Sequence, residues 1–320
     1  MSDEPDAASD PPVDLPVVHV DRPPTGDDLA VAAGRARLVG PDDDALDGVA
    51  ATVIGVGHRW DADRFARFPD LRVVSRMGIG YDNVDVEAAR AAGVTVCHAP
   101  DAPTVSTAEH TMALLLAVTK ELPQQHDRAR GGEWGNPSPT ALELDGAVLG
   151  LVGCGRIGRR VARAATALGM RVIAFDPAGP AEGGATDPDG VEYVDLDTVI
   201  ETADVISLHA PATPETHHVI GTDSLVRMKR GVYLVNCARG PLVDEAALID
   251  ALDSGRVAGA GLDVTDPEPP DRDAPILRHP RVIVTGHVAS STTTGRRRLF
   301  EHALDNALAV LAGEPASVVP

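Results

Sequence analysis

The amino-acid sequence predicts an α/β protein with two parallel β-sheets, and three observations support this fold class. Short apolar strands alternate with helix-like segments between Val17 and Val96. Residues 147–177 contain an apolar strand, a glycine-rich turn, a helix and a second strand. The 320 residues are enough for two domains. Because strands that alternate with helices pair in parallel, each sheet is expected to carry helices on both faces.

The first unit is expected to follow an acidic, proline-rich tail. Residues 1–16 have little to bury and are predicted to be disordered. A helix is predicted over residues 27–33, and the strands over residues 17–20, 36–39, 52–54, 72–75 and 94–96. The segment 103–119 is apolar on nearly every helical face, which predicts a helix buried between domains or subunits. Residues 121–145 are interpreted as a polar connection to the second unit.

The second unit is organised around the turn Gly153-Cys154-Gly155-Arg156-Ile157-Gly158. It lies between a strand and a helix, in the context of a dinucleotide-binding fingerprint. Gly153 permits the tight turn, Gly155 lets the backbone approach a pyrophosphate, and Gly158 lets helix and strand pack closely. The free N–H groups at the helix N-terminus favour a bound phosphate.

Asp176 ends the second strand of this fingerprint and indicates which dinucleotide binds. A carboxylate at this position accepts hydrogen bonds from ribose hydroxyls and repels a 2′-phosphate. No lysine or arginine occurs between Arg171 and Arg227 to bind such a phosphate. The sequence therefore favours NAD over NADP.

Three polar residues follow later predicted strands, where open α/β sheets build ligand sites. These strands are expected over residues 204–208, 232–236, 257–262 and 282–285, with a last helix over residues 296–312. Arg239 is suited to binding a carboxylate through two parallel hydrogen bonds. His287 is suited to acid/base catalysis, because imidazole as a group ordinarily titrates near neutral pH. Glu268 is expected to orient the imidazole ring and to favour its protonated form.

Composition excludes several function classes. The net charge of −20 argues against nucleic acid and anionic membranes as partners, and the longest apolar run, Met112 to Val118, is too short to span a bilayer. Lys120 and Lys229 are the only lysines, a composition that resembles halophilic proteins. Three cysteines without a CxxC pair argue against disulfides and a zinc site, so a cytoplasmic protein without a metal is expected.

These motifs together resemble the D-isomer-specific 2-hydroxyacid dehydrogenase family. The resemblance covers about Val17 to Ala312 and rests on GCGRIG with Asp176, MKRGVYLVNCARGPLVDE, GLDV followed by PEP, and GHVAS. It implies a Rossmann NAD-binding domain (residues 104–287) inserted into a smaller flavodoxin-like substrate domain (residues 17–103 and 288–320). Gly286 departs from the family pattern, in which a proline usually precedes the histidine.

The resemblance also implies the activity and the site residues. The expected reaction interconverts a D-2-hydroxy acid and its 2-keto acid, with Arg239, Glu268 and His287 as the catalytic set. The remaining implied residues are Arg76, Gly78, Ile79 and Gly80 in the substrate loop, with Ile79 also facing the cofactor, and Ala210, Pro211, Cys237, Ala238 and Asp263 around NAD. Family members form dimers through the helix after Pro103 and the connection to Asp145.

Two alternatives remain open from the sequence. The same scaffold serves dehydrogenases of other small anions, although these do not rely on a carboxylate–histidine pair such as Glu268 and His287. It also serves NAD(H)-sensing corepressor-like binding proteins, because a fold does not fix a function. Neither the identity of the hydroxy acid nor the favoured direction of the reaction follows from the sequence.

Overall fold

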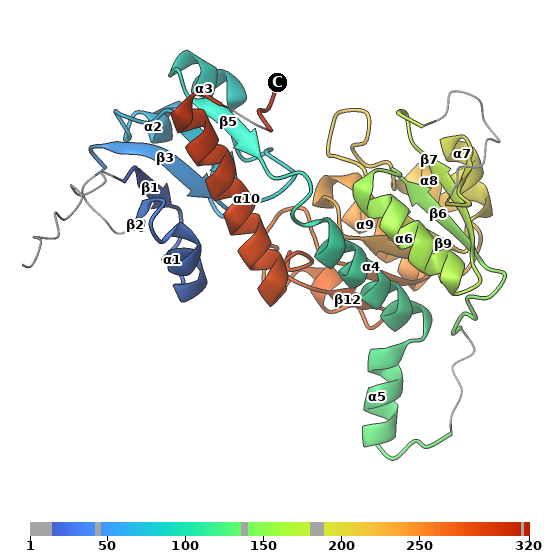
Figure 1. The fold of residues 1–320 in the computed structure, drawn as a ribbon. Coiled ribbons are helices and arrows are strands. Elements are labelled where there is room, and N and C mark those ends of the chain that lie inside the picture. Colours follow the sequence, from blue (N-terminus) through green and yellow to red (C-terminus); the bar gives the residue numbers. More distant parts are fainter. Residues whose placement is uncertain (1–14, 42–45, 136–139, 180–188, 315–316) are drawn as a thin grey trace, which may run out of the picture. The chain divides into compact units, whose positions relative to one another are not determined.

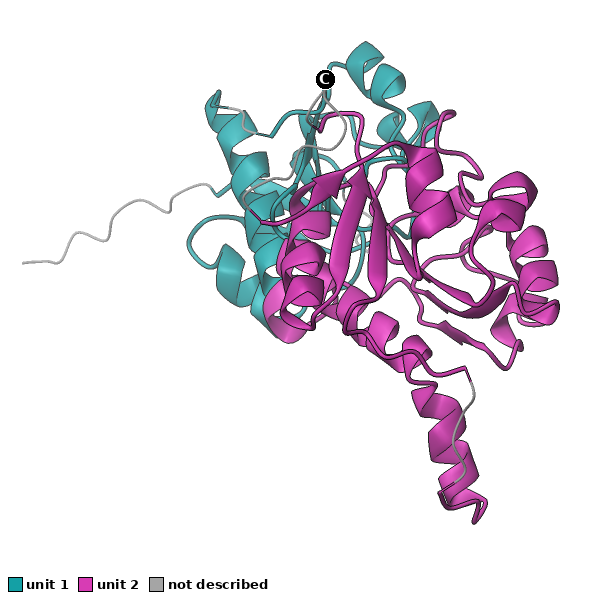
Figure 2. Cartoon of the chain, turned by 90° about the vertical axis from the view of Figure 1, so that its right-hand side faces the viewer, with its two compact units in different colours: residues 1–103, 296–320 teal, residues 104–295 magenta. Residues whose placement is uncertain are grey.

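The computed structural model describes residues 15–41, 46–135, 140–179, 189–314 and 317–320. The predicted disorder of the tail over residues 1–14 therefore lies outside the described residues. The chain forms two compact units, with residues 1–103 and 296–320 in unit 1 and residues 104–295 in unit 2 (Figure 2). The chain returns from unit 2 to unit 1 after Gly295, which is later than the expected domain boundary after His287. Residues past His287 stay with unit 2 because they bond to it: the Thr292 hydroxyl lies 2.9 Å from that of Ser106.

Unit 1 is built on a five-stranded sheet with the order β2-β1-β3-β4-β5. All of its strand pairs are parallel. This order is that of flavodoxin-like folds, and it places ligand sites at the carboxyl edge of the sheet. The strands are β1 (Val17–Val20), β2 (Arg37–Val39), β3 (Val49–Ile54), β4 (Val73–Arg76) and β5 (Thr95–His98).

Helices cover both faces of the unit 1 sheet, as the βα alternation predicts. They are α1 (Gly26–Ala32), α2 (Ala62–Phe65), α3 (Val86–Ala91) and, from its residue 296 onward, α10 (Thr293–Ala312) (Figure 1). Successive strand residues alternate between two apolar clusters: Val53 packs with α1 and α10, and Ile54 packs with α2 and α3. Thr25 begins α1 through a capping box, in which its side chain accepts the N–H of Asp28.

Unit 2 is built on a seven-stranded sheet with the order β12-β11-β10-β9-β6-β7-β8. All of its strand pairs are parallel. Its strands are β6 (Val148–Val152), β7 (Arg171–Phe175), β8 (Glu192–Tyr193), β9 (Val205–Leu208), β10 (Val232–Asn236), β11 (Val257–Leu262) and β12 (Val282–Val284). Counted within the unit, the order runs 3-2-1-4-5-6 and then adds a seventh strand, which is the Rossmann arrangement. The predicted fold class is therefore confirmed.

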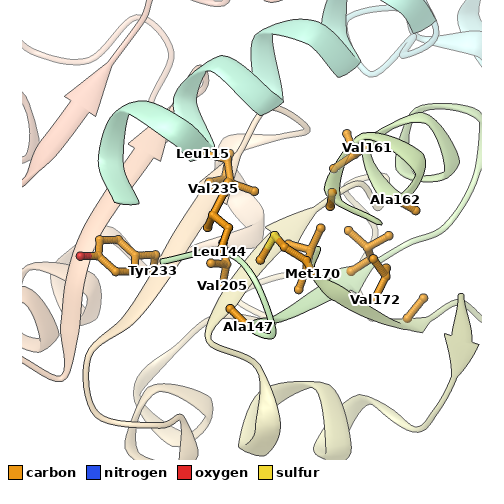
Figure 3. Close-up of a cluster of buried hydrophobic side chains, with 14 of the residues drawn as sticks. Leu115, Leu144, Ala147, Val161, Ala162, Met170, Val172, Val205, Tyr233 and Val235 are labelled. Atoms are coloured by element: carbon orange, nitrogen blue, oxygen red, sulfur yellow. The ribbon is translucent and has the colours of Figure 1, made fainter. Parts of the chain in front are cut away.

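Two helix layers enclose the unit 2 sheet. One face carries α4 (Thr104–Thr119) and α6 (Arg156–Ala167), where Leu115 and Val161 meet strand residues such as Val205 and Val235 (Figure 3). The second cluster holds α7 (Leu196–Thr202), α8 (Thr222–Arg227) and α9 (Glu245–Asp253), with the 3-10 turns η1 (Gly240–Leu242) and η2 (Pro275–Leu277). With both faces covered, the strands are nearly continuous apolar runs, as expected for a buried parallel sheet.

The segment predicted as a polar connection contains a helix, α5 (Leu122–Arg130). None of its residues is buried, and it extends away from the body of unit 2 (Figure 1). The helix begins at a proline in its first turn and ends on basic residues, both of which suit helix termini. Without an apolar face the sequence gives no periodic signal, which is why the pattern did not predict it.

Candidate active site

The glycine-rich turn joins β6 to α6, and its three glycines differ in the space that a Cβ would find at each position. Gly153 has a φ of +93°, and a Cβ there would lie 2.7 Å from the carbonyl oxygen of His209. A Cβ on Gly158 would lie 2.7 Å from the carbonyl oxygen of Gly153. A Cβ on Gly155 would meet no atom within 4 Å. Gly153 and Gly158 are therefore required by packing, whereas Gly155 faces open space.

The N-terminus of α6 has the features of an anion site. Its N-cap is Gly155, so no side chain caps the first turn. Gly155 and Arg156 are exposed, and Ile157 is half-buried. The first backbone N–H groups of a helix lack intrahelical partners and attract negative charge. The turn thus fits the pyrophosphate of a dinucleotide, which is the group that the sequence predicts.

Asp176 braces the same turn from the end of β7. Its Oδ2 accepts the N–H of Cys154 at 2.7 Å, and its Oδ1 accepts the N–H of Ala178 at 2.9 Å. The carboxylate remains half-buried, with part of its surface toward solvent. Each carboxylate oxygen has a second lone pair, so this arrangement leaves acceptor capacity for ribose hydroxyls.

The neighbouring strand β9 is followed by His209, Ala210 and Pro211. The N–H of His209 donates to the carbonyl oxygen of Val152 at 2.7 Å, which holds this loop against the glycine-rich turn. Burial lowers the pKa of His209 to about 4, so its ring is neutral near pH 7. The ring lies 2.9 Å from the hydroxyl of Ser207. Ala210 is half-buried and Pro211 is exposed at the same sheet edge.

Asn236 shapes the loop that carries Arg239 at the end of β10. Its Oδ1 accepts the N–H of Ala238 at 3.0 Å, and its Nδ2 donates to the carbonyl oxygen of Arg239 at 2.8 Å. The next residue, Gly240, packs so closely that a Cβ would lie 1.9 Å from the carbonyl oxygen of Thr265. The Arg239 guanidinium donates to the carbonyl oxygen of Ala238 at 2.7 Å, and the residue is half-buried.

Cys237 lies in this loop below the surface. Its exposed fraction is 9%, and burial raises the pKa of its thiol to about 12. The side chain is therefore a neutral thiol at pH 7, and it packs with apolar residues of unit 2. Ala238, the next residue, is half-buried.

His287 and Glu268 form a close pair of ionisable side chains at this edge of the sheet. His287 Nδ1 lies 2.5 Å from Glu268 Oε1, and the two side chains are 25% and 36% exposed. Because the carboxylate accepts from Nδ1–H, the Nε2 atom is left to exchange a proton with another molecule. The pair therefore has the arrangement of a general acid/base with an orienting carboxylate.

Asp263, which is predicted to line the cofactor, is tied by hydrogen bonds to the loop that carries His287. Its side chain has no exposed surface. Its carboxylate accepts the Thr285 hydroxyl at 2.5 Å and the N–H groups of Val288 and Ala289 at 2.9 and 2.8 Å, and its carbonyl oxygen accepts the N–H of His287 at 2.7 Å. A buried carboxylate needs such donors because burial of an unpaired charge is costly. Asp263 thus holds the loop of His287 from beneath.

The predicted substrate loop of unit 1 follows β4, and Arg76 and Gly78 have contacts within it. The N–H of Gly78, which is predicted to face a substrate, donates to the carbonyl oxygen of Arg76 at 2.9 Å. Arg76 is 4% exposed, and its guanidinium donates to the carbonyl oxygen of Met77 at 2.6 Å. In this structure Arg76 supports the loop from below because its guanidinium lies against the Gly78 backbone.

Ile79 and Gly80 form the tip of this loop. Ile79 is 36% exposed at the tip. Within the described part of the chain, the N–H groups of Ile79 and Gly80 donate to no other group. The ring of His98 accounts for the shape of the tip, since its Nδ1 lies 2.8 Å from the carbonyl oxygen of Ile79. Ile79 and Gly80 therefore present two N–H groups that are available to an anion.

Several residues that shape these loops had no assigned role in the sequence analysis. Besides Asn236 and Thr285, Asn83 binds the carbonyl oxygens of Gly55 and His58 through its Nδ2, at 3.0 and 2.9 Å. Each such residue is an amide or hydroxyl close in sequence to a strand end, next to a candidate site residue. That proximity is the only signal that the sequence offers for Asn83 and Thr285, since their partners lie more than 20 residues away along the chain.

The described residues contain neither a membrane-spanning helix nor a cluster of metal ligands. No helix among them combines the length and apolarity needed to cross a bilayer. No three histidine, cysteine, aspartate or glutamate side chains among them gather as metal ligands do.

The part of the chain that contains these residues is similar to known proteins. Residues 112–289 match the family described as "D-isomer specific 2-hydroxyacid dehydrogenase, NAD binding domain". A D-3-phosphoglycerate dehydrogenase of Methanocaldococcus jannaschii is 41% identical over 268 residues, which are 83% of this chain and 51% of that protein. A glyoxylate reductase of Thermofilum pendens is 38% identical over 258 residues, 79% of this chain and 76% of that protein.

Solved structures agree with these sequence matches. The crystal structure of a D-lactate dehydrogenase from Aquifex aeolicus, complexed with NAD and lactic acid, superposes with a TM-score of 0.82 at 30% identity. The match covers 93% of this chain and 96% of that one. By contrast, the chain spans about half the length of the phosphoglycerate dehydrogenases that it matches, 51% in the case of the M. jannaschii protein.

Proposed function

The chain belongs to the D-isomer-specific 2-hydroxyacid dehydrogenase family, and we propose that it interconverts a small D-2-hydroxy acid and its 2-keto acid with NAD as cofactor. The observation that carries this proposal is the 2.5 Å contact between His287 Nδ1 and Glu268 Oε1. It supplies a proton donor at the carboxyl edge of a Rossmann sheet, where such folds bind their ligands. Arg239 supplies a cation at the same edge, after β10.

The residues of unit 2 divide the chemistry between them. Arg239 binds the carboxylate of the 2-keto acid and fixes the position of its carbonyl group. Protonated His287 donates from Nε2 to the carbonyl oxygen during reduction, which neutralises the charge that develops there. Glu268 holds the ring by accepting from Nδ1 and stabilises its protonated form. In the oxidative direction neutral His287 accepts the hydroxyl proton.

NAD supplies the hydride chemistry, and the turn between β6 and α6 would hold it. The open space at Gly155 would leave room for the pyrophosphate, Gly153 and Gly158 permit the close packing of the turn, and the α6 N-terminus with Arg156 and Ile157 would face the phosphates. Ala210, Pro211, Cys237 and Ala238 are proposed to border the cofactor along the ends of β9 and β10. Asp176 would bind the adenosine ribose and disfavour a 2′-phosphate. In unit 1, the N–H groups of Ile79 and Gly80 are proposed to bind a substrate carboxylate.

A panel of 2-keto acids tests the proposed activity. Purified protein is mixed with NADH and, in separate reactions, glyoxylate, pyruvate, hydroxypyruvate, 3-phosphohydroxypyruvate or a longer 2-keto acid. We expect oxidation of NADH with at least one of these, and the D-isomer of the hydroxy acid as product. Tight NADH binding without turnover on the whole panel would contradict the proposal and favour a nucleotide-sensing protein.

The proposed assembly is a homodimer formed through α4 and α5. Leu122 and Trp134 are 54% and 89% exposed on and just after α5, and such apolar surface is typical of protein contacts. Light scattering during gel filtration is expected to give twice the mass of 33.3 kDa. A Trp134→Ser variant should shift that mass toward the monomer. A wild-type protein that elutes at the monomer mass at micromolar concentration would contradict this proposal.

The acidic composition supports a further part of the proposal, which is a cytoplasmic protein adapted to high salt. A net charge of −20 destabilises a compact chain through self-repulsion, and salt at about 1 M screens charges beyond about 3 Å. The denaturation temperature should therefore rise between 0.1 and 3 M KCl. Equal denaturation temperatures at the two salt concentrations would contradict halophilic adaptation.

A further inference from the structure

We propose that His110 is a positioning residue for the acid/base His287, and that it acts through Thr285 and Asp263. The inference rests on the proposed function, because it assigns a role in the same site. His110 lies on α4, whereas Asp263 and Thr285 follow β11 and β12. The three side chains meet below the loop that carries His287. None of the roles assigned so far uses His110.

The direction of the hydrogen bonds defines a chain that begins at His110. The Thr285 hydroxyl donates its one proton to Asp263 Oδ1 at 2.5 Å. Its oxygen is then an acceptor for His110 Nε2, which lies 3.0 Å away. The same ring atom lies 3.5 Å from Asp263 Oδ1, so it also faces the carboxylate. His110 thus carries a proton on Nε2 and fixes the orientation of the Thr285 hydroxyl.

This series of hydrogen bonds ends on the backbone around His287. Asp263 accepts three successive N–H groups, those of His287 through its carbonyl oxygen and those of Val288 and Ala289 through its carboxylate. His287 itself has a φ of +52°, a conformation that residues with a side chain adopt only when their surroundings hold them there. The orientation of the Asp263 carboxylate therefore sets the position of the His287 ring.

Gly286 explains why this loop needs such support. Glycine restricts its own backbone angles less than other residues do. A Cβ at Gly286 would meet no atom within 4 Å, so close packing does not fix the backbone at this position either. The loop is held instead by bonds on either side of the glycine, to Thr285 and to the three N–H groups from His287 onward. His110 also places its Nε2 donor near a carboxylate with no exposed surface, and such polar surroundings lower the cost of burying that charge.

Three variants test the inference by activity. His110→Leu removes the donor and should lower kcat about tenfold with KM for NADH within about twofold, since misplacement of the ring affects the reaction and not cofactor binding. His110→Gln restores an N–H donor at a similar reach and should recover kcat to within about threefold of wild type. Glu301→Leu is the control, because Glu301 is exposed on α10, outside the helices proposed to form the dimer, and should behave as wild type.

A second measurement needs no cofactor and no turnover. Hydrogen exchange of the Val288 and Ala289 amides should be about tenfold faster in His110→Leu than in wild type, while amides of β10 keep their protection. Thr285→Val, which keeps the branched shape, should give the same acceleration. The double variant should exchange these amides little faster than either single variant, because both changes break the same series of hydrogen bonds. This second variant keeps the inference testable if His110→Leu does not fold.

The outcomes separate this inference from the proposed function. A wild-type protein without activity on any 2-keto acid contradicts the proposed function, and the exchange measurement still tests the link from His110 to the loop. An active wild type with unchanged kcat in His110→Leu contradicts the positioning role. Unchanged exchange of the Val288 and Ala289 amides in His110→Leu also contradicts it.

Discussion

Replacement of Glu268 by glutamine removes one charge beside His287 and keeps the size of the side chain. The 2.5 Å contact is a hydrogen bond between two ionisable groups, and such bonds contribute about 1.5–3 kcal/mol. The two side chains are 25% and 36% exposed, so solvent weakens the interaction toward the lower end of that range. A loss of about 1.5 kcal/mol from the transition state corresponds to roughly a tenfold lower kcat.

The assay is steady-state reduction of the best 2-keto acid by NADH at pH 7. We expect Glu268→Gln to lower kcat about tenfold and to leave KM for the keto acid within about threefold, because Arg239 still binds the carboxylate. Glu301→Gln is the control, since Glu301 is exposed on α10. The denaturation temperatures of both variants should match wild type. A Glu268→Gln enzyme with wild-type kcat would show that the carboxylate neither orients His287 nor stabilises its protonated form.

The remaining predictions concern the cofactor turn and its surroundings. Gly155→Ala should raise KM for NADH at least tenfold with no change in denaturation temperature, whereas Gly158→Ala should lower that temperature, because only the second new Cβ meets backbone, at 2.7 Å. Asp176→Asn should reduce the preference for NADH over NADPH, measured as a ratio of kcat/KM values, and an unchanged ratio would contradict its role. The folded-state pKa of His209 is about 4, below its ordinary 6.5, so the unfolded state binds the proton first and stability is lost as pH falls from about 6.5 toward 4. Denaturant titrations at pH 7 and 4.5 should show a smaller loss for His209→Gln, and equal losses would contradict this assignment.

The sequence predicted most of the fold because the relevant signals are local. Each strand of both sheets except β8 contains at least two apolar residues, and the predicted bounds fall within three residues of those observed. The two-residue strand β8 and the helix α5 were missed for opposite reasons. β8 is too short to show a period, and α5 has no buried face to create one.

Site residues were predictable where a motif carries its own chemistry. Gly153 and Gly158 have backbone contacts that only glycine permits, so their identity is fixed by sterics that any such turn shares. His287 and Glu268 were brought together by the expectation that adjacent strand ends meet at one edge. Trp60 shows the limit of this approach: it follows a strand as the site residues do, yet it is fully buried among Phe65 and Phe68.

A polar residue after a strand can either face a ligand or hold the loop that faces it, and sequence does not separate the two. Asp263 and Glu268 are both carboxylates beyond the end of β11, but the first side chain has no exposed surface and the second is 36% exposed. The difference arises from donors distant in sequence, Thr285 and the N–H groups after His287, which draw Asp263 inward. A substitution of Asp263 would therefore lower activity as a catalytic residue does, while its direct effect would be on the position of His287. Only a measurement that follows the loop itself, such as amide exchange, distinguishes these two roles.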